Sequence, residues 1–149
     1  MARFTALLLS AAFATAASSA GGVRAEVVGG TLEALRKNTS SRLDFSDVDS
    51  LFIRCDKAEF RIPYHTIRVI EYGQTVGRRY ISALLISPIL LLSKARKHFL
   101  TLEFISNGKT EAVVFRVNKN DVRAALASVE ARTGRSVDYL DDEARKSGR

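Results

Sequence analysis

The chain has 149 residues, 46% of them hydrophobic, so it is long enough for one domain with an apolar core. Its 23 Lys and Arg residues outnumber 16 Asp and Glu residues, and the resulting net charge of +7 favours anionic partners or surfaces. Cys55 is the sole cysteine, which excludes an intramolecular disulfide and leaves the core alone to hold the fold together.

Residues 1–20 have the layout of a secretory signal. Arg3 precedes an apolar run over residues 4–17, and small side chains suited to a signal peptidase follow it. The run is too short to span a bilayer comfortably, which favours a cleaved signal over a retained membrane anchor. We therefore expect export to the periplasm or the extracellular space, with cleavage near residues 16–25.

Residues 21–44 are predicted to be a partly flexible leader. Glycine recurs at its start, and a polar break occupies residues 38–41. Between them, residues 31–37 fit either a short strand or a helical turn. The domain itself is expected to cover residues 45–134.

Strands begin at Leu51. Leu51, Ile53 and Cys55 alternate with outward positions, which predicts one strand with an apolar face. Asp56-Lys57 supplies a turn into a second strand. Pro63 interrupts the hydrogen-bond ladder of that strand and therefore predicts a sheet edge or a bend.

A third strand is predicted over residues 66–72. Successive side chains of a strand point to opposite faces. We therefore expect Ile67 and Val69 on one face, and Ile70 and Tyr72 on the other.

The last part of the domain predicts a hairpin followed by a helix. Apolar residues alternate over residues 100–104 and 113–117, and Asn107-Gly108 between them suits a tight turn with positive φ. Asn118 is a suitable helix cap and Gly134 a suitable helix end. The apolar stripe of this helix is Val122, Ala125, Leu126 and Val129.

These elements predict an α+β fold. We expect a strongly bent antiparallel sheet or a partly closed barrel, capped by the C-terminal amphipathic helix. Residues 135–149 are charged and poor in apolar side chains, so they are expected to form a disordered tail.

Two segments resemble bacterial pleckstrin-homology-like (PH-like) domains. Residues 62–73 (IPYHTIRVIEYG) resemble a strand element of that family, and residues 94–104 (KARKHFLTLEF) are similar to a basic segment followed by a strand in small bacterial proteins of this kind. The resemblance covers residues 45–134, which include the final hairpin and helix. It implies a helix-capped barrel that serves as a binding or scaffolding module, and it supplies no catalytic residues.

A second apolar run, residues 81–92, has basic residues on both sides. It is too short to cross about 30 Å of hydrocarbon, and Pro88 prevents an uninterrupted helix. Either the run dips into a membrane interface or a partner while its cations meet lipid phosphates, or it is buried in the core, as continuous apolar runs more often are. The candidate surface-binding residues are Arg78, Arg79, Leu84, Leu85, Ile86, Leu90, Leu91, Lys94, Arg96 and Lys97.

The sequence offers little support for metal binding. Neither His65 nor His98 has a carboxylate or cysteine at metal-ligand spacing, and His98 is expected to be one more cation at low pH. The acidic cluster Asp44, Asp47 and Asp49 lacks the glycine and the distal glutamate of a calcium loop, which indicates a solvated turn.

Other candidate chemistry is equally weak. Alternation with Leu51 and Ile53 favours a buried Cys55 thiol over a nucleophile. Residues 73–79 could cradle an anion between Gly73 and Gly77, although they do not match a phosphate-loop pattern.

We therefore expect an exported, non-enzymatic binding or scaffolding domain without cofactor or metal. Its expected partner is a protein or an anionic membrane surface; nucleic acid is a poor candidate, since no aromatic and basic motif of RNA-binding proteins occurs. The alternative is a small secreted hydrolase whose active site the sequence does not reveal. A convergent polar pocket would favour the enzyme, and an apolar patch ringed by Arg and Lys would favour the binding module.

Overall fold

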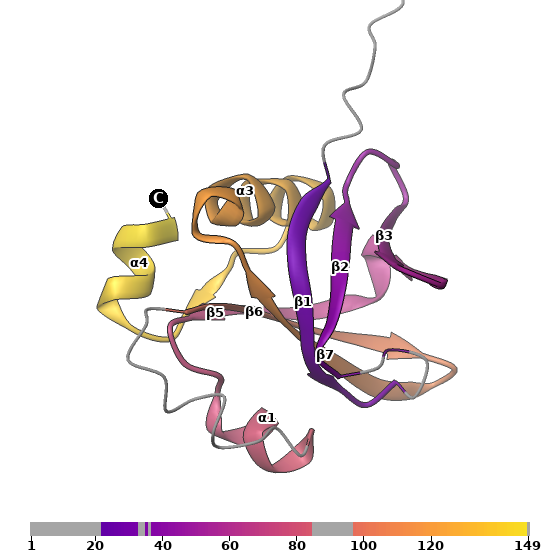
Figure 1. Cartoon of the computed structure of the whole chain (residues 1–149), viewed down its shortest axis with the longest axis horizontal. Coiled ribbons are helices and arrows are strands. Elements are labelled where there is room, and N and C mark those ends of the chain that lie inside the picture. Colours follow the sequence, from indigo (N-terminus) through magenta and orange to yellow (C-terminus); the bar gives the residue numbers. More distant parts are fainter. Residues whose placement is uncertain (1–21, 33–34, 36, 85–96, 149) are drawn as a thin grey trace, which may run out of the picture.

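The computed structural model describes residues 22–148 apart from 33–34, 36 and 85–96. Within that part of the chain, one open mixed sheet has the strand order β4-β3-β2-β1-β7-β6-β5-β8 (Figure 1). The strands are β1 (Val23–Gly30), β2 (Thr39–Asp44), β3 (Ser50–Cys55), β4 (Ala58–Pro63), β5 (Ile67–Gly73), β6 (His98–Ser106), β7 (Lys109–Val117) and β8 (Asp138–Tyr139). The helices are α1 (Arg78–Ala83), α3 (Val122–Thr133) and α4 (Asp142–Gly148), with single 3-10 turns η1 (Tyr64–Thr66) and η2 (Lys119–Asp121).

The predicted α+β class and the C-terminal helix are confirmed, while the predicted antiparallel sheet or partly closed barrel is instead an open, mixed sheet. All neighbouring strands run antiparallel except β8, which lies parallel to β5. The sheet is therefore mixed. The parallel pair is possible since the chain passes through α3 before it returns to the edge beside β5. The predicted signal, residues 1–20, lies outside the described residues.

The predicted leader is wrong, because residues 21–44 contain β1 and β2. β1 lies inside the sheet, between β2 and β7. Its glycines have a structural reason, since the pairing with β7 shifts register between Val27 and Gly29. A Cβ on Gly30 would lie 3.1 Å from the Ala112 carbonyl oxygen, so the glycine permits a close approach of two backbones.

The predicted strands between residues 51 and 63 are confirmed as β3 and β4. Leu51 and Ile53 are fully buried and Cys55 partly so, on the face opposite Phe52 and Arg54. Pro63 closes β4, which is an edge strand of the sheet. Its missing N–H therefore leaves no gap in an interior ladder.

The face assignment for β5 is wrong. Ile67, Ile70 and Tyr72 all lie in the same core cluster, whereas strict alternation places Ile67 with Val69. The pairing with β6 shifts register between Ile67 and Val69, and this irregularity turns Ile67 to the face of the later residues.

The predicted hairpin and helix are confirmed. Asn107 and Gly108 join β6 to β7 with φ of 50° and 73°, the positive values that such a tight turn requires. The expected apolar stripe of α3 is buried, and Gly134 ends the helix with φ of 67°. Asn118 caps the preceding turn η2, since its side chain accepts a hydrogen bond from the Asn120 N–H.

Apolar clusters lie on both faces of the sheet. The larger cluster joins the sheet to α3 and α4, and Figure 1 shows these helices above it. The smaller cluster joins β1, β6 and β7 to α1, which lies below the sheet in Figure 1. Its members are Val28, Val76, Tyr80, Leu84, Phe99, Ala112 and Val114, with Ile81 packed against them.

The predicted disordered tail is also wrong. Residues 135–149 supply β8 and α4, and they place Val137 and Ala144 in the larger cluster with exposed fractions of 6% and 0%. Asp141 caps the start of α4, because its Oδ1 accepts a hydrogen bond from the Ala144 N–H. A few apolar side chains are therefore enough to pack this highly charged segment against the core.

We predict that Ala144→Asp lowers the free energy of unfolding by at least about 2 kcal/mol, because the carboxylate would be buried without a partner. Urea denaturation of residues 21–149 measures the change. The control is Ala127→Asp on the exposed face of α3, which should cost less than about 1 kcal/mol. Equal effects of the two variants would contradict the docking of α4 on the core.

Candidate functional site

A basic surface depression of about 450 Å³ lies where β1 and β6 begin and β7 ends. Four cationic side chains contribute to it, and Glu26 is the one acidic residue of its lining. We call this feature the basic depression. It is lined by Arg24, Ala25, Glu26, Ser40, Lys97, His98, Arg116, Val117, Asn118 and Lys119.

Strand register explains why these side chains converge. Glu26 lies directly opposite Arg116 in the β1–β7 pairing, and the two side chains form an ion pair. His98 lies opposite Val117 in the β6–β7 pairing, one residue from Arg116. The Arg24 guanidinium lies 3.5 Å from Asp121, an exposed pair that contributes little stability.

A second depression of about 310 Å³ continues the first toward α3 and α4. The two share His98 and Lys119. We call the second feature the His98 pocket. It is lined by His98, Lys119, Asn120, Arg123 and Ser147. Arg123 and Lys119 are exposed, and neither forms an ion pair with another residue among those the structure describes.

His98 is held by Tyr72 on the neighbouring strand β5. The ring of His98 is 4% exposed, and its Nδ1 lies 2.6 Å from the Tyr72 hydroxyl. The two rings are parallel to within 2° with centroids 6.1 Å apart, while Tyr139 meets the Tyr72 ring edge-on. Packing from two sides therefore fixes the direction in which the imidazole points.

The proton positions follow from the pKa values of this pair. Burial raises the pKa of Tyr72 to about 12, so the hydroxyl keeps its proton at neutral pH. Burial, aided by the charge of Lys119, lowers the pKa of His98, so the ring is neutral there. The Tyr72 hydroxyl and His98 Nδ1 share one hydrogen bond, and where the hydroxyl is its donor, the hydrogen of the neutral ring lies on Nε2.

His98 is thus buried and neutral at pH 7, and its lowered pKa opposes the positive charge at low pH that the sequence predicted. Its Nε2 is buried and has no hydrogen-bond partner within the described part of the chain. A buried donor without an acceptor is costly, and such groups are rare in folded proteins.

The loop at residues 73–79 holds an internal anion. The Glu71 carboxylate accepts a hydrogen bond of 2.6 Å from Arg79, and a Cβ on Gly77 would lie 2.8 Å from the other carboxylate oxygen. The Tyr80 hydroxyl donates to Glu103 at 2.9 Å, and this bond fixes α1 to β6. The loop therefore surrounds a carboxylate of its own chain in the position where an external anion was considered.

The structure separates the predicted surface-binding residues. Arg78 is exposed, Arg79 is engaged with Glu71, Leu84 is buried in the smaller cluster, and Lys97 lines the basic depression. Within the described start of the apolar run, Leu84 is therefore a core residue. The remaining candidates, Leu85, Ile86, Leu90, Leu91, Lys94 and Arg96, lie outside the described residues.

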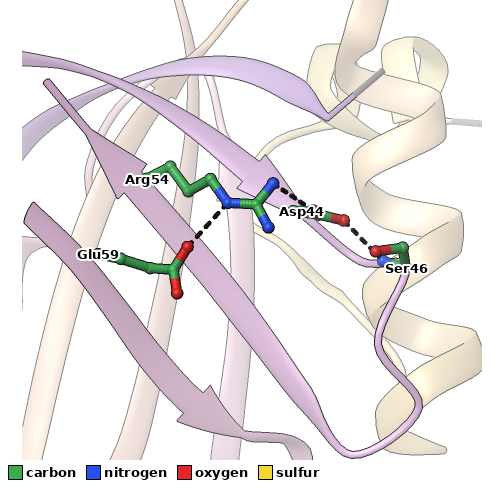
Figure 2. Close-up of polar contacts among 4 residues, drawn as sticks. All are labelled: Asp44, Ser46, Arg54 and Glu59. Carbon is green, nitrogen blue, oxygen red and sulfur yellow. Dashed lines mark hydrogen bonds and ion pairs between the residues drawn. The ribbon is translucent and has the colours of Figure 1, made fainter. Parts of the chain in front are cut away.

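The acidic cluster organises a turn and one exposed ion network. The Asp44 carboxylate accepts from the Ser46 N–H and pairs with Arg54 at 2.6 Å, and Arg54 also pairs with Glu59 at 2.8 Å (Figure 2). The hydrogen bonds from Ser46, with a smaller contribution from Arg54, lower the pKa of Asp44. Asp47 accepts from two backbone N–H groups, as the side chain of a turn residue commonly does.

Cys55 is partly buried, and this burial together with the nearby Asp56 raises the pKa of its thiol. A raised pKa disfavours the thiolate, which is the nucleophilic form. Among the residues described, no group of three or more His, Cys, Asp or Glu side chains is arranged to hold a metal ion.

Within the same part of the chain, no helix combines the length and the apolar character needed to cross a membrane. No protein-family model matches the chain, and none of the curated proteins is significantly similar to it.

Sequence reasoning missed most of this site. Lys97 was a candidate, but Arg24, Arg116, Lys119 and Arg123 were not, because they come from two other regions of the chain, residue 24 and residues 116–123. The available signal was the pair of basic residues on either side of Asn118, at the junction between the predicted hairpin and helix. These two basic residues lie on one side of the basic depression. The other side is formed by β1, which the sequence analysis placed in the leader.

We predict that Tyr72→Phe lowers the free energy of unfolding by about 1–3 kcal/mol, because it leaves the buried Nδ1 of His98 without a donor. The matched control is Tyr64→Phe. The Tyr64 hydroxyl is buried without a partner among the described residues, so its removal should be neutral or stabilising. Urea denaturation compares both variants, and a loss of stability confined to Tyr64→Phe would refute the assignment.

Stability should also fall as the pH decreases from about 7 to 5. His98 has a lowered pKa in the fold, so the unfolded chain takes up its proton near pH 6.5 while the folded chain resists protonation. His98→Gln should remove part of that fall in the free energy of unfolding. His65→Gln, which replaces an exposed histidine, is the matched control. An unchanged pH dependence in His98→Gln would contradict the neutral, buried imidazole.

Proposed function

We propose that this chain is an exported, non-enzymatic binding domain that associates with an anionic membrane surface. The observation that supports this best is the basic depression, with cations from β1, β7, η2 and the start of β6 on one surface. Cations near an anionic leaflet contribute about 1 kcal/mol each, so such a cluster is enough to retain a small domain.

The apolar run belongs to the same proposal. Lys97 both lines the basic depression and follows the run, and Leu84 and Phe99 on either side of residues 85–96 pack in one cluster. In this proposal the run contacts the membrane together with the cations on either side of it, and Arg78 is a further exposed cation before it.

The His98 arrangement favours binding over hydrolysis. A hydrolase would need a histidine nitrogen free to accept a proton from its nucleophile. In His98, Nδ1 is engaged with the Tyr72 hydroxyl and Nε2 is buried, so neither nitrogen is placed to take a proton from a nucleophile.

The fold supports the further proposal of a PH-like domain. Consecutive antiparallel hairpins precede a C-terminal helix that packs on one face of the sheet, as in a helix-capped barrel. In this proposal β8 and α4 are additions to that plan, and they occupy the side of the sheet next to β5.

Vesicle flotation tests membrane association. The protein is residues 21–149, the unit in which the described strands and helices bury one another, and the vesicles contain phosphatidylglycerol and phosphatidylcholine in equal parts. We expect co-flotation at low salt, loss of it at high salt, and none with phosphatidylcholine alone. Lys119→Gln combined with Arg123→Gln should weaken partitioning about thirtyfold.

The control variant removes the same two charges elsewhere. Lys109 lies at the far end of β7 and Arg135 beyond the C-terminal end of α3, and both are exposed. Lys109→Gln with Arg135→Gln should partition like the parent. Absence of flotation with anionic vesicles at low salt would overturn the proposed function.

A further inference from the structure

We propose that the His98 pocket is a binding site for a phosphate group, either of a lipid headgroup or of a soluble phosphate monoester. This inference rests on the proposed function for the anionic nature of the partner, and it names the group recognised and the residues that recognise it. It is carried by the buried Nε2 donor of His98, which lines the pocket beside two exposed cations.

In this proposal Tyr72 is the donor in its hydrogen bond with His98 Nδ1, so the neutral ring carries its hydrogen on Nε2. In the imidazolium both nitrogens carry hydrogens. With this assignment, the group that satisfies Nε2 is a hydrogen-bond acceptor in both protonation states of the ring.

The remaining lining selects an anion with several acceptor atoms. Lys119 comes from η2, Arg123 from the first turn of α3 and His98 from β6, so the donors approach from three elements. Phosphate offers three or four oxygens to such an arrangement, whereas a carboxylate offers two. Arg and Lys are also the usual phosphate-binding side chains, and the positive end of the α3 dipole lies on the same side.

Access to Nε2 requires movement of the side chains around it. The nitrogen has almost no solvent-accessible surface, while Lys119 is exposed and close enough for its charge to lower the pKa of His98. A flexible lysine stem changes rotamer readily, and an anion that attracts the ammonium group would draw it away from the ring. The volume of about 310 Å³ accommodates a phosphate group with part of its ester.

NMR of the imidazole groups tests the site directly. Inorganic phosphate is titrated at neutral pH and constant ionic strength into residues 21–149 with ¹⁵N-labelled histidine. We expect a saturable shift of the His98 Nε2 resonance, while that of the exposed His65 changes little. Lys119→Gln with Arg123→Gln should weaken binding at least about tenfold, and Lys109→Gln with Arg135→Gln should not.

Further arms identify the source of the phosphate. A soluble monoester, glycerol 3-phosphate, is compared with vesicles that carry phosphatidic acid or phosphatidylglycerol, and acetate reports on carboxylate binding. Tighter binding to phosphatidic acid than to the soluble ester assigns the lipid headgroup, and the reverse order assigns the soluble one. Equal shifts with acetate and phosphate, or no saturable His98 shift, would overturn the site.

The two proposals fail in different ways. Flotation that depends on Lys119 and Arg123 without a phosphate effect on His98 would refute the pocket and leave membrane association standing. A phosphate-dependent His98 shift without flotation would refute membrane association and leave the pocket standing.

Discussion

The pairing of β1 with β7 connects the two halves of the sheet. β2, β3 and β4 lie on one side of this pairing, and β6, β5 and β8 on the other. Adjacent residues of β1 point to opposite faces, so Val27 enters the larger apolar cluster and Val28 the smaller one. Both clusters therefore depend on the position of this strand, and the glycines at its end let it approach β7 closely.

The same strand couples the core to the charged surface. Its apolar part builds the clusters, while Arg24 and Glu26 at its start form one wall of the basic depression. The opposite wall comes from the junction of β7 with η2, which the hairpin places beside β1 by register. Tyr72 then orients His98 from β5 beneath this surface. Burial of the histidine and exposure of its charged neighbours are two results of one strand arrangement.

Local signals were sufficient for the hairpin β6–β7, for α3, and for β3 and β4. In those segments a turn dipeptide, a helix end or an edge proline coincides with the apolar period, so neighbouring residues decide the structure. β1 was missed because its glycines serve a bulge and a close approach that only a partner strand reveals. α4 was missed because Ala144, its residue in the larger cluster, is small and has charged neighbours, so the segment shows no apolar pattern.

The site was harder to predict than the fold. Arg24 lies more than 90 residues before Arg116 and Arg123, and strand order brings these regions together, which composition does not reveal. His98 was visible as a residue, but its neutral state depends on Tyr72 and on burial. In the Gly73–Gly77 loop the sequence suggested a site for an external anion. The structure instead places the Glu71 carboxylate there.

The order of strands also affects when the chain can fold. β1 comes early in the sequence, yet one of its two partners is β7, whose residues follow about 90 positions later. Until β7 is available, the first strand can pair only with β2, and the two halves of the sheet remain unconnected. Such a high contact order delays folding until nearly the whole chain is present. A nascent chain of this protein can therefore complete its sheet only after β7 has been synthesised.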